Sequence, residues 1–351
     1  MSTFYKLTIK EVKKETPQSI SVVFNIPLEF TDFYKFKAGQ YVNLKLTLDG
    51  KEIRRAYSIC SSPTSNELRI AIKAVKNGTF SKFANEQLSA GNVIEVGTPE
   101  GRFTFEPQLD RQRNYMAFVA GSGITPVMSI LQNVLQQEPK SSFVLIYGNK
   151  TLEDTIFYNQ LSELQQQYIG RLSVHYVFSQ KNIEGQLFGR IDKSVVNFVH
   201  NKHNGQEFSK YYLCGPEEMI SQVSAALKEK NIAEKDIKFE LFTAAPSAEN
   251  PTESSVNNEH TKITVIVDGD EETFEMSTKQ TLLEAALKQG LDAPYSCQGG
   301  ICSSCIAKIT SGTAVMKKNT ILTDKEVASG LILTCQAVPT SASITVDYDD
   351  V

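Results

Sequence analysis

The sequence predicts a multidomain protein in which an antiparallel β-barrel is followed by a doubly wound α/β domain and then by a smaller third domain. The chain has 351 residues, whereas one domain usually holds about 100–200. Apolar and polar residues alternate over about the first hundred positions, and short apolar runs then alternate with helical patterns. These two patterns are typical of antiparallel and parallel sheets respectively.

Composition excludes several classes of protein. Hydrophobic residues make up 41% of the chain and charged residues 22%, which is a globular rather than a disordered balance. No run approaches roughly 18 uninterrupted apolar residues and the N-terminus carries no apolar signal segment, so we expect no membrane span and a cytoplasmic location. The net charge of −4 disfavours nucleic-acid binding.

The charge is unevenly distributed along the chain. Residues 1–245 hold 29 Lys and Arg against 25 Asp and Glu, a net of +4, whereas residues 262–351 hold 7 Lys against 12 Asp and Glu, a net of −5. Residues 246–261 are rich in Ser, Pro, Asn and Glu and nearly free of large apolar side chains, which is typical of a linker. We therefore expect an acidic domain tethered to a slightly basic body.

Strands within residues 1–110 are identified by alternation with a period of two. Apolar side chains alternate from Val42 to Leu48 and again from Leu68 to Ala74. Short strands separated by turn residues at such spacing favour a small closed sheet. This pattern carries the prediction of a barrel.

Two segments of the predicted barrel suit an anionic ligand. Arg55 is followed by Tyr57 and Ser58 at the end of a strand, where an arginine can pair with phosphate while the aromatic ring packs on a flat cofactor. An exposed Arg beside a packed Tyr in a plain barrel strand is the simpler explanation of that pattern alone. Gly78, Thr79 and Ser81 stand at a predicted helix start, where N–H groups and hydroxyls suit phosphate. Two such sites favour a ligand with a diphosphate.

Residues 111–245 alternate between strands and helices, which predicts a parallel sheet wound on both sides. The expected strands are 115–120, 143–148, 172–178, 211–216 and 237–242.

The first of these parallel strands is followed by Gly121, Gly123, Thr125 and Pro126. Such a turn presents N–H groups and a helix dipole to an anion, and proline is tolerated in the first helical turn. The segment is not G-x-G-x-x-G, because Pro126 occupies the last position, and a tight turn without a ligand is equally consistent. Cys214 ends another strand, facing the expected crevice, although a lone cysteine is more often core filler.

Four cysteines form the strongest pattern in the chain. Cys297, Cys302 and Cys305 have the spacing C-x4-C-x2-C, and Cys335 follows after 29 residues. This is the plant-type spacing of a [2Fe–2S] cluster. A zinc site usually has two closely spaced cysteine pairs, and only Cys302 and Cys305 form one here. Disulfides are disfavoured without an export signal.

Motifs along nearly the whole chain resemble the ferredoxin–NADP reductase superfamily fused to a C-terminal plant-type ferredoxin. Among these proteins the chain is similar to oxygenase reductases, and in particular to the reductase subunits of phenylacetyl-CoA epoxidases. The motifs are RRAYSIC (54–60), AGSGITP (120–126), LIYGNK (145–150), FSQ (178–180), GRID (189–192), CGP (214–216), PYSCQGGICSSC (294–305) and LTCQAVP (333–339).

The resemblance implies an FAD-binding barrel at 1–110, an NAD(P)-binding α/β domain at 111–245 and an α+β, β-grasp-like ferredoxin domain at 262–351. It also implies residue roles. For FAD, these are Arg55 on the pyrophosphate, Tyr57 on the isoalloxazine, Ser58 near N5, Gly78, Thr79 and Ser81 on the second phosphate, and Phe242 near the ring. For the nucleotide, they are Gly121, Gly123, Thr125 and Pro126 on the dinucleotide and Cys214 beside the nicotinamide. Ser58, near flavin N5, and Cys214 are accordingly the candidate catalytic residues.

We predict NADPH as the coenzyme, because no acid follows the second parallel strand to bond a ribose 2′-hydroxyl. Lys150, Ser179 and Arg190 are the candidate 2′-phosphate ligands, although solvated loop cations explain the two charges equally simply. The resemblance implies that electrons pass from NADPH through FAD and the cluster to diiron oxygenase subunits of a phenylacetyl-CoA epoxidase complex. The alternatives are another oxygenase or a hybrid-cluster protein as acceptor and, more remotely, a zinc-stapled regulatory module without flavin.

Overall fold

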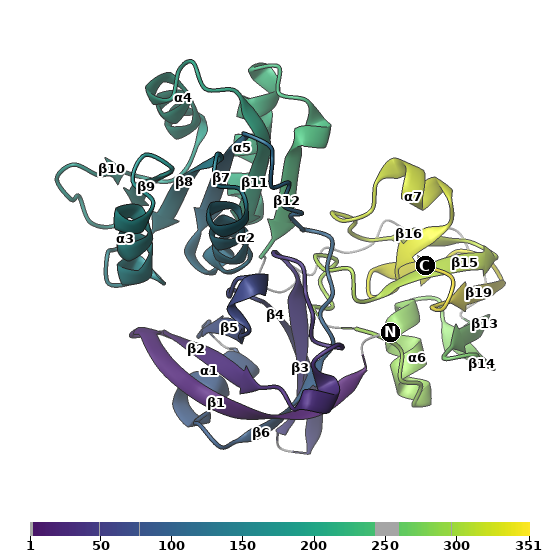
Figure 1. The fold of residues 1–351 in the computed structure, drawn as a ribbon. Coiled ribbons are helices and arrows are strands. Elements are labelled where there is room, and N and C mark those ends of the chain that lie inside the picture. Colours follow the sequence, from purple (N-terminus) through teal and green to yellow (C-terminus); the bar gives the residue numbers. More distant parts are fainter. Residues whose placement is uncertain (1–2, 49, 77, 243–259, 296) are drawn as a thin grey trace. The chain divides into compact units, whose positions relative to one another are not determined.

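The computed structural model describes residues 3–48, 50–76, 78–242, 260–295 and 297–351. One compact unit spans Phe4–Phe242, and the described residues from His260 onwards belong to a second unit. Figure 1 follows the chain from the purple N-terminal strands, through the teal helices, to the yellow C-terminal strands. The two units are treated separately below.

The first part of the larger unit is an antiparallel sheet of six strands in the order β4-β3-β6-β1-β2-β5. Its ends meet through an antiparallel bridge between Ile59 and Ile70, which closes the sheet. Alternate apolar side chains, including Leu7, Val22 and Leu44, fill the interior because successive residues of a strand face opposite sides. The elements are β1 (Phe4–Thr16), β2 (Ser19–Asn25), β3 (Tyr41–Leu48), β4 (Lys51–Ser58), β5 (Leu68–Lys73), α1 (Thr79–Gln87) and β6 (Val93–Gly97).

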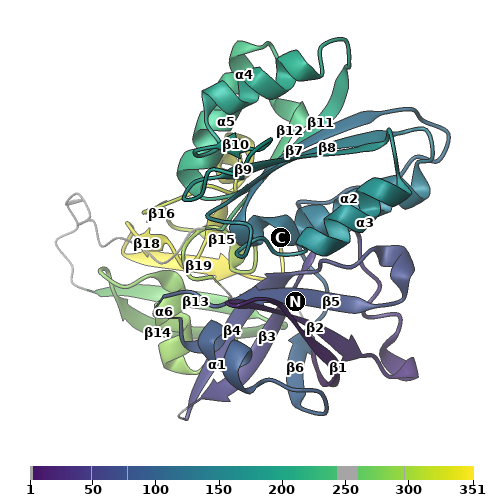
Figure 2. The same ribbon diagram turned by 90° about the vertical axis from the view of Figure 1, so that its left-hand side faces the viewer.

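The second part is a sheet of parallel strands in the order β10-β9-β8-β7-β11-β12. Helices α4 and α5 lie on one face of the sheet and α2 and α3 on the other (Figure 2). The elements are β7 (Asn114–Ala120), α2 (Ile124–Gln137), β8 (Ser142–Asn149), α3 (Tyr158–Gln167), β9 (Leu172–Phe178), β10 (Leu187–Phe188), α4 (Lys193–Lys202), β11 (Phe208–Gly215), α5 (Glu217–Glu229) and β12 (Ile237–Leu241).

The second unit is a mixed sheet in the order β14-β13-β19-β15-β17, with a small β16-β18 pair. Helix α6 covers its core. Thr281 and Glu284 form a capping box at the helix start, and Gly290 ends the helix with a φ of 89°. The elements are β13 (His260–Val267), β14 (Asp270–Ser277), α6 (Leu282–Gln289), β15 (Ile306–Ser311), β16 (Ala314–Met316), α7 (Asp324–Ala328), β17 (Leu331–Leu333), β18 (Ala337–Pro339) and β19 (Ser343–Asp347).

The predicted fold class is confirmed, since a closed antiparallel sheet, a parallel α/β domain and an α+β domain follow one another. The structure groups the first two into one unit. Residues 246–259 of the predicted linker lie outside the described residues, and His260 and Thr261, placed there from composition, begin β13. No described helix has the length and apolarity needed to cross a membrane.

Candidate functional site

Two adjacent arginines on strand β4 have different surroundings. Arg54 is buried, donates to Glu52 at 2.8 Å and lies over the Phe4 ring. Arg55 is exposed, and its guanidinium donates only to the carbonyl of Arg54 among the contacts of the described residues. Arg54 therefore has a structural role in packing β4 against the Phe4 ring. Arg55 instead presents an exposed cation that suits a phosphate.

The start of helix α1 lies next to the Tyr57 side chain. The Tyr57 and Phe80 rings are 5.6 Å apart. Gly78 precedes the helix, Thr79 is exposed on its first turn, and the buried Ser81 hydroxyl accepts from the N–H of Val75 at 3.3 Å. A Cβ on Gly78 would collide with the Ser81 Oγ. The local packing thus requires glycine here and leaves the helix N-terminus open for an anion.

The glycine turn after β7 brings the nucleotide-domain strands close together. Gly121 has a φ of +55°, in the region that favours glycine, and a Cβ on Gly123 would collide with the Cys214 carbonyl. Thr125 is buried and donates to the Ser122 carbonyl at 3.0 Å. Pro126 is buried in the first turn of α2. The turn is therefore shaped for close backbone approach.

Lys73, at the end of barrel strand β5, reaches this turn. Its Nζ lies 3.9 Å from the position that a Cβ on Gly121 would take. Burial lowers the pKa of Lys73, and nearby Lys150 lowers it further while Asp154 opposes the effect. A cation from the barrel therefore faces the turn that is expected to hold a diphosphate.

Ser58 and Cys214 meet at a third residue, Glu240 on β12. Cys214 and Glu240 are register partners on adjacent strands. The Ser58 hydroxyl lies close enough to the Glu240 carboxylate to affect its pKa, while Glu240 Oε2 is buried without a hydrogen-bond partner among the described residues. Burial raises the pKa of Glu240 to about 8, and the nearby Ser58 hydroxyl opposes that rise. Burial, and then the Glu240 charge, raise the pKa of Cys214 well above its ordinary value. Ser58, at the end of β4, therefore lies near Cys214 and Glu240, at the C-terminal ends of the parallel strands β11 and β12.

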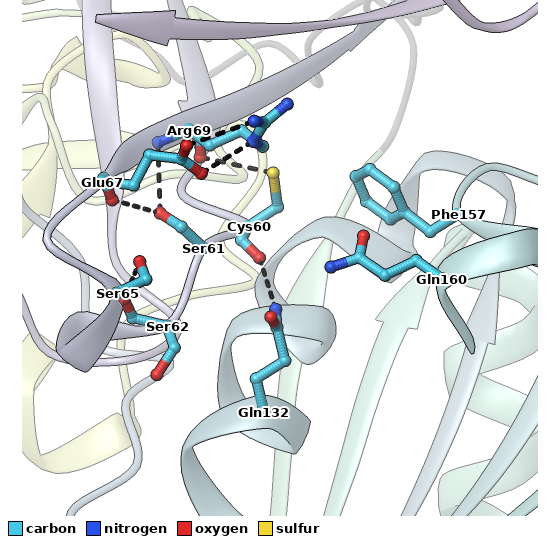
Figure 3. A pocket seen from close by; sticks show the side chains of 9 residues that line it. All are labelled: Cys60, Ser61, Ser62, Ser65, Glu67, Arg69, Gln132, Phe157 and Gln160. Atoms are coloured by element: carbon cyan, nitrogen blue, oxygen red, sulfur yellow. Dashed lines mark hydrogen bonds and ion pairs between the residues drawn. The ribbon is translucent and has the colours of Figure 1, made fainter. Parts of the chain in front are cut away.

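Helix α2 also joins the two parts of the larger unit. Ser129 donates to the carbonyl of Ser61 at 2.6 Å, and Gln132 donates to that of Cys60 at 3.0 Å. Figure 3 shows the Gln132 contact at the wall of a small cavity that Phe157 also lines. Cys60 and Ser61 closely follow Ser58, and α2 begins at the glycine turn. These two bonds therefore fix the candidate flavin segment around Ser58 relative to the candidate nucleotide turn at 121–123.

Phe242 ends the described part of this unit. Its N–H donates to the Gly215 carbonyl at 3.1 Å, and the partly buried ring packs against the main core of the α/β domain. The ring is therefore held beside the Cys214-Gly215 strand end, where the resemblance predicts an aromatic residue.

The candidates for the 2′-phosphate are only partly brought together. Ser179 donates to the Asn149 carbonyl at 3.0 Å through its N–H, which places it beside the exposed Lys150. Arg190 forms an ion pair with Glu218 at 3.8 Å, with both side chains more than 70% exposed. An exposed pair of this kind is weak, so its cation remains available to a phosphate.

The four cysteine side chains of the predicted cluster converge in the second unit. The Cys297 sulfur lies close to those of Cys302 and Cys335, and the Cys305 sulfur lies close to that of Cys335. These contacts lower the pKa of Cys297 and Cys305, because a thiolate is stabilised by a neighbouring S–H donor. The same contacts raise the pKa of Cys302 and Cys335, as the donors.

The surrounding loop suits a cluster with negatively charged sulfurs. The N–H of Gly299 donates to the Cys297 sulfur at 3.3 Å, and the N–H of Ile301 also points toward it. A [2Fe–2S] cluster takes two ligands on each iron, and no three His, Cys, Asp or Glu side chains among the described residues are grouped to hold a metal ion. Four neighbouring thiols with backbone N–H donors fit the two-iron group.

Sequence reasoning missed Lys73 and Glu240. Lys73 continues an ordinary strand pattern, and Glu240 lies in a short apolar strand. A buried carboxylate in such a strand is costly unless it has a partner, so Glu240 was the more detectable of the two. Its partner Ser58 lies far away in the chain, which hides the pairing.

Three family models match consecutive parts of the chain. The oxidoreductase FAD-binding domain matches residues 6–105, the oxidoreductase NAD-binding domain residues 118–225, and the 2Fe-2S iron-sulfur cluster binding domain residues 265–340. FAD, a pyridine nucleotide and a [2Fe–2S] cluster are accordingly the cofactors of this chain.

Full-length relatives have the same organisation. A subunit of 1,2-phenylacetyl-CoA epoxidase from Escherichia coli is 38% identical and covers 99% of both chains. The ferredoxin reductase component of 3-ketosteroid-9-alpha-monooxygenase from Rhodococcus rhodochrous is 31% identical over 97% of this chain and 96% of its own. The solved structure of phthalate dioxygenase reductase shares the fold, with a TM-score of 0.63, 23% identity and 98% of both chains covered. The chain therefore belongs to the ferredoxin–NADP reductase superfamily, among the oxidoreductases that serve as reductase components of oxygenases and carry a C-terminal plant-type [2Fe–2S] domain.

Proposed function

We propose that this chain takes electrons from NADPH and delivers them, through FAD and a [2Fe–2S] cluster, to the diiron oxygenase subunits of a phenylacetyl-CoA epoxidase. The 38% identity with the Escherichia coli epoxidase subunit over 99% of both chains supports this acceptor. The geometric observation that carries the reductase chemistry is the register pairing of the buried Cys214 with Glu240, next to the buried Ser58. It joins the strand that carries the flavin motif to the strand end that faces the nucleotide crevice.

The residues of this chain have binding and positioning roles in the proposal. Arg55 and the α1 N-terminus with Gly78, Thr79 and Ser81 hold the FAD phosphates, while Tyr57 and Phe242 pack on its ring. The Gly121–Gly123 turn, Thr125 and Pro126 hold the dinucleotide, and Lys73 adds a cation to it. Cys297, Cys302, Cys305 and Cys335 hold the irons.

The chemistry needs orientation more than it needs a strong base. When bound, FAD accepts a hydride from the nucleotide and releases the electrons one at a time to the cluster. Ser58 and Cys214 are buried, so they would exclude water from the nicotinamide and flavin rings when these are bound. Holding the reacting atoms in contact contributes much of the rate.

The proposed preference for NADPH rests on Lys150, Ser179 and Arg190 and on the absence of an acid directly after β8. The test compares kcat/KM for NADPH and NADH in the unaltered protein and in the Lys150→Ala, Arg190→Ala double variant. We expect NADPH to be preferred and the double variant to lose most of that preference. A preference for NADH at the start, or an unchanged ratio, contradicts this assignment.

The acceptor is tested with purified oxygenase subunits. We expect NADPH-dependent epoxidation of phenylacetyl-CoA when this chain is mixed with diiron subunits of such an epoxidase. A different acceptor is favoured if those subunits stay oxidised while another oxygenase or a hybrid-cluster protein is reduced. A visible spectrum without flavin and iron–sulfur bands would leave only the zinc alternative, which the FAD-binding and 2Fe-2S family matches disfavour.

A further inference from the structure

The side chain of Gln336 lies among the cysteines of the second unit. Gln336 directly follows Cys335 and is only 9% exposed. Both main-chain polar groups of Gln336 are hydrogen bonded: its N–H donates to the Leu333 carbonyl at 2.9 Å, and its carbonyl accepts from the Lys317 N–H at 2.9 Å. The start of the side chain is therefore fixed, and its amide points inward.

Three acceptors surround the amide nitrogen of Gln336. Nε2 lies 3.1 Å from the Gln298 carbonyl, 3.1 Å from the Cys335 carbonyl and 3.7 Å from the Cys335 sulfur. The two carbonyls only accept hydrogen bonds, and the Cys335 sulfur would do the same as a thiolate ligand of the cluster, so the NH2 end of the amide, rather than its oxygen, must face them. The orientation of the amide thus follows from its neighbours.

The loop opposite Gln336 is shaped to admit this side chain. A Cβ on Gly300 would lie 2.9 Å from the Gln336 Cγ, and Gly300 has a φ of +70°. Glycine is therefore required both by the backbone and by the close approach. The amide connects the end of the Cys335 segment to the loop that begins at Cys297.

From this geometry we infer that Gln336 is a positioning residue that raises the reduction potential of the bound cluster, through an N–H···S hydrogen bond to Cys335. The inference rests on the proposed role of Cys335 as a ligand. Hydrogen bonds to the sulfurs are among the determinants of iron–sulfur potentials. A donor stabilises the more electron-rich, reduced state more than the oxidised state, because the sulfur carries more negative charge after reduction.

The experiment measures the midpoint potential of the cluster by a redox titration followed by electron paramagnetic resonance. Gln336→Leu removes the donor at similar volume. We expect the cluster to be retained and its potential to fall, so that the equilibrium constant for accepting an electron decreases about tenfold, or about 59 mV for a one-electron couple. The rate of flavin reduction by NADPH should not change, because that step takes place in the other unit.

The matched control is Thr320→Val. The Thr320 hydroxyl donates to the Gly300 carbonyl at 2.8 Å, so its loss disturbs the same loop without removing a donor to sulfur. We expect the Thr320→Val potential to equal that of the unaltered protein. An unchanged potential in Gln336→Leu, or equal shifts in the two variants, would overturn the inference.

A second variant covers failure of the first to load iron. Gln336→Glu keeps the shape of the side chain and loses the amide donors, so it should also lower the potential. If neither variant holds iron although circular dichroism shows a folded chain, Gln336 has a structural role and the tuning role is wrong. If the unaltered chain itself shows no [2Fe–2S] signal, the proposed function fails before any variant is compared.

Discussion

At the scale of single residues, Arg54 and Arg55 are identical side chains that occupy different environments on the same strand. Arg54 is buried against Glu52 and Phe4, whereas Arg55 is exposed on the neighbouring position. The contrast follows from the period of two along a strand, which sends adjacent side chains to opposite faces. It leaves only Arg55 of this pair able to meet a phosphate.

Replacing Arg55 by Ala should weaken FAD binding. A charge-assisted hydrogen bond contributes about 1.5–3 kcal/mol, which corresponds to roughly a 10- to 100-fold loss of affinity. Titration of the flavin-free protein with FAD measures the effect. The control is Arg111→Ala, which removes an exposed arginine from the segment between β6 and β7. Equal affinities in the unaltered protein and the Arg55 variant would contradict the phosphate role.

Glu240 should give the reductive step a pH dependence. Burial raises its pKa to about 8, so the carboxyl is neutral below that pH and negative above it. A negative charge next to Ser58 opposes the transfer of a hydride into the same low-dielectric site. We therefore expect flavin reduction at saturating nucleotide to slow as the pH rises through about 8.

The profile should become flat in Glu240→Gln, as measured by stopped-flow absorbance. Glu207→Gln, which changes an exposed carboxylate on the loop before β11, should retain the profile of the unaltered protein. Two identical profiles for the unaltered protein and Glu240→Gln would refute the involvement of this carboxyl.

At the scale of elements, the end of helix α2 is held by a buried carboxylate. Glu138 is fully buried and accepts from the Gln108 N–H at 2.8 Å, the Tyr115 hydroxyl at 2.9 Å, the Ser141 hydroxyl at 2.7 Å and the Arg113 guanidinium. Burial alone would raise the pKa of Glu138, but these hydrogen bonds outweigh it and hold the pKa below its ordinary value.

Replacing Glu138 by Gln should therefore lower the free energy of unfolding by about 3 kcal/mol at neutral pH, because Arg113 loses its buried partner. A depressed carboxyl pKa contributes stability above its unfolded-state value, and this contribution is lost as the pH falls through the folded-state value. The difference between the two proteins should thus shrink as the pH falls below the ordinary glutamate pKa of about 4.3.

Urea unfolding at several pH values measures this difference. Glu163→Gln on helix α3, where the side chain is exposed, is the control and should have little effect. A pH-independent difference between the Glu138 variant and the unaltered protein would contradict the linkage.

The sequence predicted the elements better than it predicted the contacts between them. The bounds of β9 agree with the expected strand 172–178, because that element carries its own apolar pattern. The four cysteines could be predicted as cluster ligands for the same reason, since a ligand loop encodes its spacing locally. Glu240 and Lys73 owe their environment to partners distant in the chain, and the ion pair of Arg190 depends on how α5 packs. The residues next to each of these side chains in the sequence carry no pattern from which those contacts could be predicted.

At the scale of the whole molecule, the two units carry opposite net charges. Residues 1–245 sum to +4 and residues 262–351 to −5. In the second unit, part of the acidic charge lies on strand β14, where Glu271, Glu272 and Glu275 are exposed. Attraction between opposite charges raises the frequency of encounter and is weakened by salt. The passage of an electron from one unit to the other should therefore depend on ionic strength.

We expect the rate at which the cluster is reduced to fall about threefold when ionic strength rises from about 0.01 M to about 0.15 M, because the Debye length shortens from about 30 Å to about 8 Å. Flavin reduction at saturating nucleotide should change little, since it occurs within one compact unit. Stopped-flow absorbance follows the flavin, and rapid freeze-quench electron paramagnetic resonance follows the cluster. The Glu271→Gln, Glu272→Gln, Glu275→Gln variant should show a weaker salt dependence, because it reduces the negative charge of the second unit. Cluster reduction that does not respond to salt would mean that net charge plays no part in bringing the units together.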